Sequence, residues 1–152
     1  MAGGVTPPEL AALKNWLLDT GPVIAYLDSG DLEHDAVAVC IDGFTGRFAT
    51  TSAVITEVMH FVAAEKGGPR LLAEFLLSTG TQVYDLCRPP EIVEAALLME
   101  KYADTPMDFA DATLVLLAEG IDAHDILTLD RRGFRTYRTR RRRAFRLALD
   151  NA

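Results

Sequence analysis

Residues 15–28, NWLLDTGPVIAYLD, place an apolar segment, an acid and a helix start in direct succession. The segment 15–19 has the length and apolar content of a short buried strand that ends on Asp19. Thr20-Gly21-Pro22 follows at once, and because Pro suits the first turn of a helix, we expect a helix that continues to Leu27. The stretch therefore predicts a strand that carries an acid to the start of a helix.

The rest of the chain repeats this alternation of strands and helices. Further strands are expected at 47–51, 81–87 and 125–129, with a turn and an edge strand within 131–138. Helices are expected at 31–44, 70–77, 89–102 and 108–119, and Gly120 should end the last of them. Another helix should begin with Ser52 as its cap, and a short helical turn is expected at 9–14. This order predicts an α/β domain with a central, mainly parallel sheet of four to five strands. In such sheets, ligands bind beyond the carboxyl ends of the strands.

The composition is that of one globular domain. The chain has 152 residues, 49% of them hydrophobic, which is enough to fill a single core. No apolar run approaches the ~20 residues that a membrane helix needs, and the first residues lack the pattern of a secretory signal. Cys40 and Cys87 have neither metal-ligand spacing nor a disulfide framework, so we expect free thiols. These features predict a cytoplasmic protein that does not contact a membrane.

Charge is distributed unevenly along the chain. Residues 1–130 carry 6 Lys or Arg against 21 Asp or Glu, whereas residues 131–152 carry nine Arg against one Asp. The basic segment favours a clamp for RNA phosphates, which would make RNA affinity salt-dependent. The alternative is a solvated tail that balances the acidic body or docks on it. The candidate RNA-binding residues are Arg138, Arg140, Arg141, Arg142 and Arg143.

Five acids occupy positions from which a shared site is expected. Asp19 and Asp130 each follow an apolar strand segment, so they should lie on the same edge of the sheet. Glu57 lies about one and a half turns into its helix, and Asp108 and Asp111 share one face at the start of another. Each acid also has a simpler reading, as a helix cap, a favourable charge at a helix start or an exposed side chain.

Carboxylates gathered at one sheet edge repel each other unless a cation is present. Oxygen ligands without Cys or His suit Mg²⁺ or Mn²⁺ rather than Zn²⁺, and such ions commonly act on phosphates. The sequence contains no GxSxG, Walker A or GxGxxG pattern, so other nucleophiles and nucleotide-binding loops are not indicated. The pattern favours metal-dependent cleavage of RNA phosphodiester bonds.

Four segments, in order and spacing, resemble PIN-domain ribonucleases, and most closely VapC-type toxins of toxin–antitoxin pairs. They are LLDTGPVIAYLD at 17–28, TTSAVITEVMHFV at 50–62, PMDFADATLVLLAEG at 106–120 and ILTLDRRGFRTYR at 126–138. The resemblance implies a three-layer PIN-like sandwich at 15–138, preceded by an extension at 1–14 and followed by an Arg-rich segment at 139–152. It also implies a Mg²⁺- or Mn²⁺-dependent endoribonuclease, often a homodimer, that is inhibited by a cognate antitoxin protein in its active-site groove.

The resemblance also assigns roles to individual residues. The catalytic acids are Asp19, Glu57, Asp111 and Asp130. Asp19 and Asp111 are expected to hold the main metal, with Glu57 and Asp130 binding directly or through water and Asp108 as a possible ligand. Thr20 and Thr128 are the supporting hydroxyls, and Thr128 is expected to support Asp130. Gly133 stands where the family often has a further acid.

Three other functions remain open from the sequence. They are a PIN nuclease of RNA maturation, a catalytically silent PIN module that binds RNA or a partner, and an acidic-site phosphatase. The apolar positions on two of the helices also have two interpretations. Apolar positions on two helices are expected either to line a groove for the antitoxin or a dimer interface, or to pack into the core. They are Val54, Val58, Phe61, Val62, Leu71, Leu72, Phe75 and Leu76.

Overall fold

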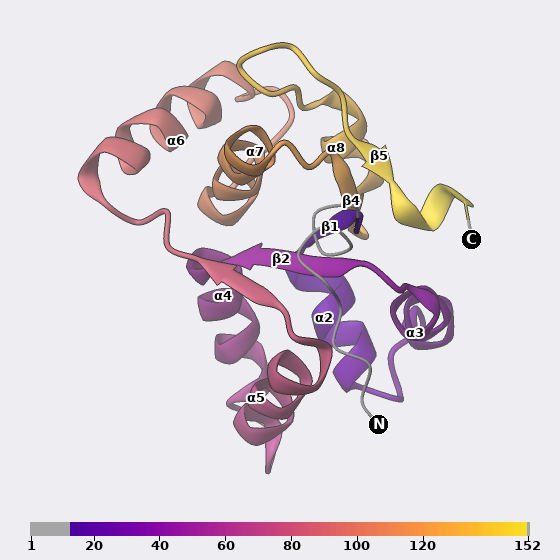
Figure 1. The fold of residues 1–152 in the computed structure, drawn as a ribbon. Coiled ribbons are helices and arrows are strands. Elements are labelled where there is room, and N and C mark those ends of the chain that lie inside the picture. The colour runs from indigo at the N-terminus through magenta and orange to yellow at the C-terminus, as the bar shows by residue number, and fades with distance from the viewer. Residues whose placement is uncertain (1–12, 152) are drawn as a thin grey trace.

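A computed structural model describes residues 13–151, which form a five-stranded parallel sheet (Figure 1). The strand order is β3-β2-β1-β4-β5. The strands are β1 (Asn15–Leu18), β2 (Arg47–Thr51), β3 (Gln82–Tyr84), β4 (Asp125–Leu127) and β5 (Arg146–Leu147). The predicted α/β class with a parallel sheet is therefore confirmed. The extension at 1–14 and the helical turn expected at 9–14 lie almost wholly outside the described residues.

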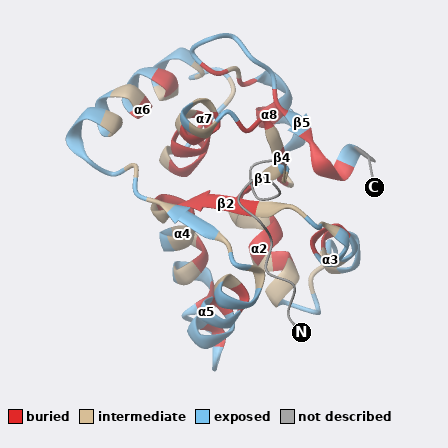
Figure 2. Cartoon of the chain, in the orientation of Figure 1, coloured by how far each residue is buried: buried red, intermediate tan, exposed pale blue. Residues whose placement is uncertain are grey.

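Helices cover both faces of the sheet and make three layers (Figure 1). They are α2 (Thr20–Leu27), α3 (His34–Gly43), α4 (Ser52–Val62), α5 (Gly68–Thr79), α6 (Pro89–Lys101), α7 (Phe109–Ile121) and α8 (Arg131–Thr136), with a 3₁₀ turn η1 (Ala148–Asn151) at the end. In this view α2 to α5 lie below the sheet, and α6 and α7 lie above it. Figure 2 shows that β2 and α7 are largely buried, whereas the outer sides of α5 and α6 are exposed. No helix in this part of the chain is long and apolar enough to cross a bilayer.

The central strands end side by side, and this register positions the acids. Leu18 at the end of β1 pairs with Leu127 at the end of β4. The backbone N–H of Asp19 then donates to the Leu127 carbonyl at 3.0 Å, so the pairing continues one residue past β1. Because all strands run parallel, the segments that follow them emerge at one edge of the sheet.

Most helix boundaries differ by one to three residues from those expected from the sequence, and two of the differences have a clear local cause. Thr51, not Ser52, caps α4, because its hydroxyl accepts from the Val54 N–H while Ser52 is already helical. Gly120 does not end α7, which continues to Ile121. The helix stops at Asp122, whose left-handed backbone (φ 50°) closes the last turn without glycine.

The expectation of an edge strand within 131–138 is wrong. Residues 131–136 form α8, because the Asp130 carboxylate accepts from the Gly133 N–H and caps a helix there. The edge strand is β5, later in the chain, which pairs with β4 and ends at buried Leu147. The end of the Arg-rich segment therefore belongs to the sheet.

Candidate active site

Asp19 lies at the carboxyl end of β1, where its side chain is almost fully buried, with 7% exposed. One carboxylate oxygen accepts from the Thr20 N–H at 2.8 Å, which makes Asp19 the N-cap of α2. The other accepts from the Thr128 hydroxyl at 2.7 Å. Burial raises the pKa of Asp19 to about 6, because it outweighs these two hydrogen bonds and is reinforced by the charges of Asp108 and Asp130. Asp19 is thus a helix cap and also a desolvated acid beside other acids.

Thr128 contacts two of the predicted acids, and only its contact with Asp19 is made to a carboxylate. Its hydroxyl donates to the Asp19 carboxylate and accepts from the backbone N–H of Asp130 at 3.0 Å. The hydroxyl therefore connects the carboxylate of Asp19, the first predicted acid, to the backbone of Asp130, the fourth. It does not contact the Asp130 carboxylate, which is held by Gly133 instead.

Glu57 is tied to the helix that begins after Asp19. The Thr20 hydroxyl donates to a Glu57 carboxylate oxygen at 2.7 Å. Since Thr20 starts α2 and Glu57 lies in α4, this bond joins two helices through residues 37 positions apart in sequence. The role of Thr20 is therefore to orient the second predicted acid.

Asp108 and Asp111 form a reciprocal capping box at the start of α7. The Asp108 carboxylate accepts from the Asp111 N–H at 2.8 Å, and the Asp111 carboxylate accepts from the Asp108 N–H at 3.2 Å. Asp108 is exposed, whereas only 8% of Asp111 is exposed. Burial, with the nearby charges of Asp19 and Asp108, raises the pKa of Asp111 strongly.

All five acids line one open cavity of about 430 Å³. Its lining consists of Asp19, Thr20, Gly21, Ile24, Glu57, Phe61, Asp108, Asp111, Leu129 and Asp130. Within residues 13–151, no three His, Cys, Asp or Glu side chains converge tightly enough to form a ready-made ion site. Each carboxylate is instead held by hydrogen bonds from neighbouring groups.

The donor set nevertheless suits a divalent cation. The polar lining offers carboxylate and hydroxyl oxygens without nitrogen or sulfur, the set that Mg²⁺ and Mn²⁺ prefer. The raised pKa values of Asp19 and Asp111 show that burial and mutual repulsion disfavour their charges. A bound cation would relieve both effects.

Tyr137 is a supporting residue that the sequence analysis missed. Its side chain is fully buried, and its hydroxyl donates to the Pro106 carbonyl at 2.9 Å, in the loop that leads to Asp108. Burial and the charges of the surrounding Asp residues raise its pKa. Its ring also lies against Gly133, where an added Cβ would come within 3.0 Å of it. A Tyr after a short polar helix carries no sequence signal that distinguishes this role from ordinary core packing.

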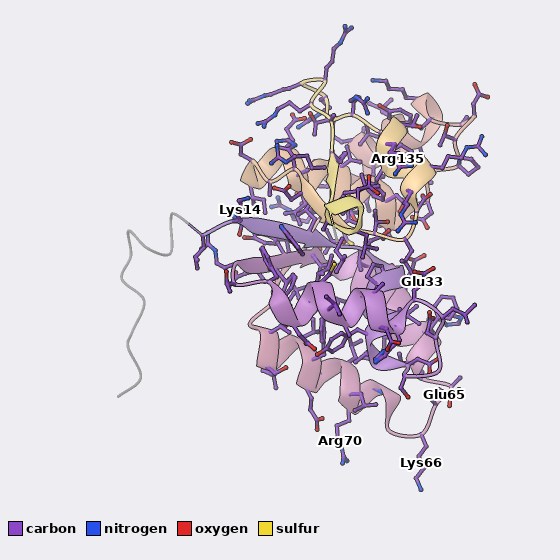
Figure 3. All side chains as sticks on the ribbon, turned by 90° about the vertical axis from the view of Figure 1, so that its right-hand side faces the viewer. Lys14, Glu33, Glu65, Lys66, Arg70 and Arg135 are labelled. Carbon is purple, nitrogen blue, oxygen red and sulfur yellow. The ribbon has the colours of Figure 1, made fainter. Side chains whose placement is uncertain are left out.

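Most of the Arg-rich segment docks on the acidic body. Ion pairs join Arg140 to Glu94 and Glu119, Arg143 to Asp122, and Arg146 to Asp125. Arg131 and Arg135, which precede the segment, pair with Asp150 near its end. Figure 3 labels Arg135 on the outer surface of this region. Arg138 donates to three backbone carbonyls of its own turn. Arg141 and Arg142 are exposed and make no ion pair with the residues that the structure describes.

The docked arginines lie away from the five acids that line the carboxylate cavity. Arg140 and Arg143 pair with Glu119 and Asp122, at the carboxyl end of α7, whereas Asp111 lies at its start. At about 1.5 Å per residue, the two ends are roughly 16 Å apart along the helix. The segment is therefore not a lining of the carboxylate cavity.

A second cavity of about 430 Å³ adjoins the first and has a mixed lining of apolar and charged residues. Its lining consists of Ile24, Leu27, Asp28, Phe61, Val62, Glu65, Lys66, Gly68 and Leu71, and Figure 3 labels Glu65 and Lys66 at the turn between α4 and α5. Among the apolar positions singled out in the sequence, Val54, Val58, Val62, Leu72 and Phe75 are buried in the core. Phe61 and Leu71 are the exposed members that face this groove.

Comparison with known proteins agrees with the fold. The PIN domain model matches residues 16–139. Ribonuclease VapC26 of Mycobacterium tuberculosis (strain ATCC 25618 / H37Rv) is 35% identical over 123 residues, which cover 80% of this chain and 91% of that protein. The crystal structure of Mycobacterium tuberculosis VapC20, a Sarcin-Ricin loop cleaving toxin, matches with a TM-score of 0.68 at 18% identity, covering 76% of this chain and 89% of that one. At that identity, the second likeness concerns the fold alone. The family match and the VapC26 identity confirm the resemblance, and the chain belongs to the PIN domain family.

Proposed function

We propose that this protein is a Mg²⁺- or Mn²⁺-dependent endoribonuclease and the toxin of a toxin–antitoxin pair. The observation that carries this proposal is the set of five acids around one cavity in a PIN domain, with Asp19 buried among them. A buried carboxylate beside other carboxylates is unfavourable for a fold unless the site binds a cation. The likeness to Ribonuclease VapC26 supports RNA as the substrate.

The metal ligands proposed are Asp19 and Asp111, with Glu57 and Asp130 binding directly or through water and Asp108 as a further candidate. When bound, the ion supplies Lewis-acid stabilisation of the phosphate and lowers the pKa of a water for in-line attack. Thr128 fixes the orientation of Asp19, and Thr20 fixes that of Glu57. Hydrolysis of this type leaves a 5′-phosphate and a 3′-hydroxyl.

The proposed role of the Arg-rich segment in RNA binding is limited to two side chains. Arg138, Arg140 and Arg143 satisfy groups of the protein itself, so their charges are already engaged. Arg141 and Arg142 project from a tight turn in which the Arg142 N–H donates to the Thr139 carbonyl at 2.8 Å. These two exposed guanidinium groups are the proposed phosphate contacts of a longer RNA.

Two partner surfaces are proposed on different sides of the molecule. The groove that contains Phe61 and Leu71 adjoins the carboxylate cavity, so an antitoxin bound there would block access to the acids. A second apolar surface lies on the exposed side of α6 and contains Ile92, Val93 and Leu97. We assign this α6 face to a homodimer interface, because three exposed apolar side chains on one helix favour a permanent partner.

Cleavage of defined RNA tests the proposed function. End-labelled RNA oligonucleotides are incubated with the protein in Mg²⁺, Mn²⁺ or EDTA, beside DNA of the same sequence. Internal cleavage of RNA that requires the metal is expected, and Asp19→Asn should reduce it at least 1000-fold. Asp104→Asn, an exposed acid outside the cavity, is the matched control and should cleave normally. Cleavage that persists in EDTA, or full activity of Asp19→Asn, would refute the assignment.

A further inference from the structure

Residues of α2 and α4 line both the carboxylate cavity and the second cavity that adjoins it. The Thr20 hydroxyl binds the Glu57 carboxylate across the two helices. Four residues later on each helix are Ile24 and Phe61, which therefore lie on the same faces as Thr20 and Glu57. Both apolar residues line the carboxylate cavity and also the adjoining second cavity. The two cavities thus share a wall of one aliphatic and one aromatic side chain.

Phe61 is unusual because its large apolar side chain is 60% exposed beside a cluster of acids. It is the only aromatic residue lining the carboxylate cavity within the described part of the chain. Its neighbours Val58 and Val62 on α4 are buried, so the helix already has its core contacts without this ring. The exposed aromatic face is therefore available to a ligand.

An RNA chain bound at the acids must continue over one of the cavity walls. The walls that carry no charge are formed by Thr20, Gly21, Ile24, Phe61 and Leu129. Phe61 lies four residues beyond Glu57, which is about 6 Å along the helix and within the span of one nucleotide. Every nucleobase has a π-face, and stacking on an aromatic side chain contributes about 1–3 kcal/mol per base.

We propose that Phe61, backed by Ile24, is a stacking subsite for the nucleobase next to the scissile phosphate. This inference rests on the proposed ribonuclease function and names a substrate contact for it. The subsite would favour single-stranded RNA, because a paired base cannot place its face on the ring. A protein helix is the other class of ligand that an exposed Phe beside the second cavity suits, and the experiment below separates the two.

RNA binding can be measured without cleavage in the Asp19→Asn background. The probe is a fluorescein-labelled 12-nucleotide oligoadenosine RNA, followed by fluorescence anisotropy in Mg²⁺. Phe61→Leu keeps an apolar side chain but removes the π-face, and it should weaken binding about ten-fold. Phe61→Trp should bind at least as tightly as the parent. An RNA of the same length with abasic sites in place of its bases should bind the parent and both variants equally.

Leu77→Ala is the matched control, since Leu77 is an exposed apolar residue that lines neither of the two cavities. It should leave oligoadenosine binding unchanged. Parent-like binding by Phe61→Leu, or equal losses on the abasic RNA, would overturn the subsite. If Phe61→Leu and Leu71→Ala both weakened antitoxin binding while RNA binding was unaffected, Phe61 would be a protein contact and the subsite would again be wrong. Cleavage by the wild-type protein is scored separately, so the ribonuclease proposal can fail or survive independently of this result.

Discussion

Asp19 shows how one side chain can serve the fold and the site with opposite effects on stability. Its carboxylate caps α2 and accepts from Thr128, and both contacts favour the charged form. Burial nevertheless raises its pKa from 3.8 to about 6, so the folded protein holds a proton on Asp19 more tightly than the unfolded chain does. A site that binds a cation requires the charged form, and the fold must therefore tolerate that charge.

Replacing Asp19 by Asn should stabilise the metal-free protein at neutral pH. The pKa of Asp19 is higher in the folded state than in the unfolded state. Its contribution to stability is therefore full below pH 3.8 and is lost as the pH rises through about 6. The difference between the folded and unfolded pKa values of Asp19 corresponds to about 3 kcal/mol. Asn retains only one acceptor oxygen and loses part of the hydrogen bonding, so we expect a gain of about 1–3 kcal/mol in the free energy of unfolding.

Urea unfolding in EDTA at pH 4 and pH 7.5 measures this effect. The gain should be present at pH 7.5 and should largely disappear at pH 4. Asp104→Asn, which alters an exposed acid, should show no such gain. Equal stability of Asp19→Asn and the parent at pH 7.5 would mean that burial does not penalise the Asp19 charge.

Gly133 sets the position of the fourth acid because no side chain fits there. A Cβ at Gly133 would lie 2.3 Å from one Asp130 carboxylate oxygen and 3.0 Å from the Tyr137 ring. Gly133→Ala must therefore displace the Asp130 carboxylate, which Gly133 also holds through its N–H. We expect kcat for RNA cleavage to fall at least ten-fold, with a loss of about 1–2 kcal/mol in stability.

Gly120→Ala is the matched control for this substitution. Gly120 lies within α7 with nothing within 4 Å of an added Cβ, so Ala should stabilise the protein by about 0.5–1 kcal/mol. Its cleavage rate should match that of the parent. Unchanged kcat in Gly133→Ala would show that the Asp130 carboxylate has no fixed role in cleavage.

Strands and helices with a clear apolar pattern could be predicted from the sequence, and those made by single polar contacts could not. The parallel sheet followed from the alternation that begins at 15–28, and 47–51 was predicted to the residue. The helix at 131–136 was missed because its six residues contain three Arg and a Gly, so only the Asp130 cap indicates it. The two-residue strand β5 was missed because it is too short to show alternation.

The same limit applies to the candidate site. Sequence spacing identified the five acids that line one cavity, because strand ends in a parallel sheet share an edge. It did not show that the Thr128 hydroxyl binds Asp19, since that bond joins residues 109 positions apart. Nor did it show that Arg140 and Arg143 bind acids on α6 and after α7, because charge runs carry no information about distant partners.

The hairpin turn in the Arg-rich segment divides its arginines into two groups with separable effects. Replacing both Arg141 and Arg142 by Gln should make the slope of log RNA affinity against log salt concentration shallower by about 1.4. Each phosphate that an arginine no longer neutralises accounts for about 0.7 of this change. Neutralising Arg143 and Arg146 to Gln removes ion pairs with Asp122 and Asp125. That change should lower the urea midpoint of unfolding slightly, because these ion pairs are exposed, and should leave the salt slope unaltered.

Filter binding of a 20-nucleotide RNA between 50 and 200 mM salt, with urea unfolding of both variants, tests this division. The Arg141 and Arg142 variant should unfold like the parent. A reduced slope in the Arg143 and Arg146 variant would show that the docked arginines release their acids to bind RNA. An unchanged slope in the other variant would leave the segment as a purely structural element.

The folded domain presents its surfaces in different directions, and this arrangement determines what a second copy can contact. The carboxylate cavity is lined by residues of α2, α4 and the start of α7, and no residue of α6 lines it. In Figure 1, α6 lies on the far side of α7 from the sheet and from α4. The exposed side of α6, visible in Figure 2, contains Ile92, Val93 and Leu97. A homodimer through this face would leave both cavities accessible to RNA and to an antitoxin.

Leu97→Asp should therefore convert a dimer into monomers. A charge at the centre of an apolar interface loses its hydration without gaining a partner, so the dimer dissociation constant should rise at least 100-fold, about 3 kcal/mol. Light scattering coupled to size-exclusion chromatography measures the change. Leu77→Asp is the matched control, because Leu77 on α5 is more exposed than Leu97 and lies outside the α6 face. Dimers that survive Leu97→Asp but dissociate in Leu77→Asp would move the interface to α5, and a wild-type protein that is monomeric at 100 µM would remove it altogether.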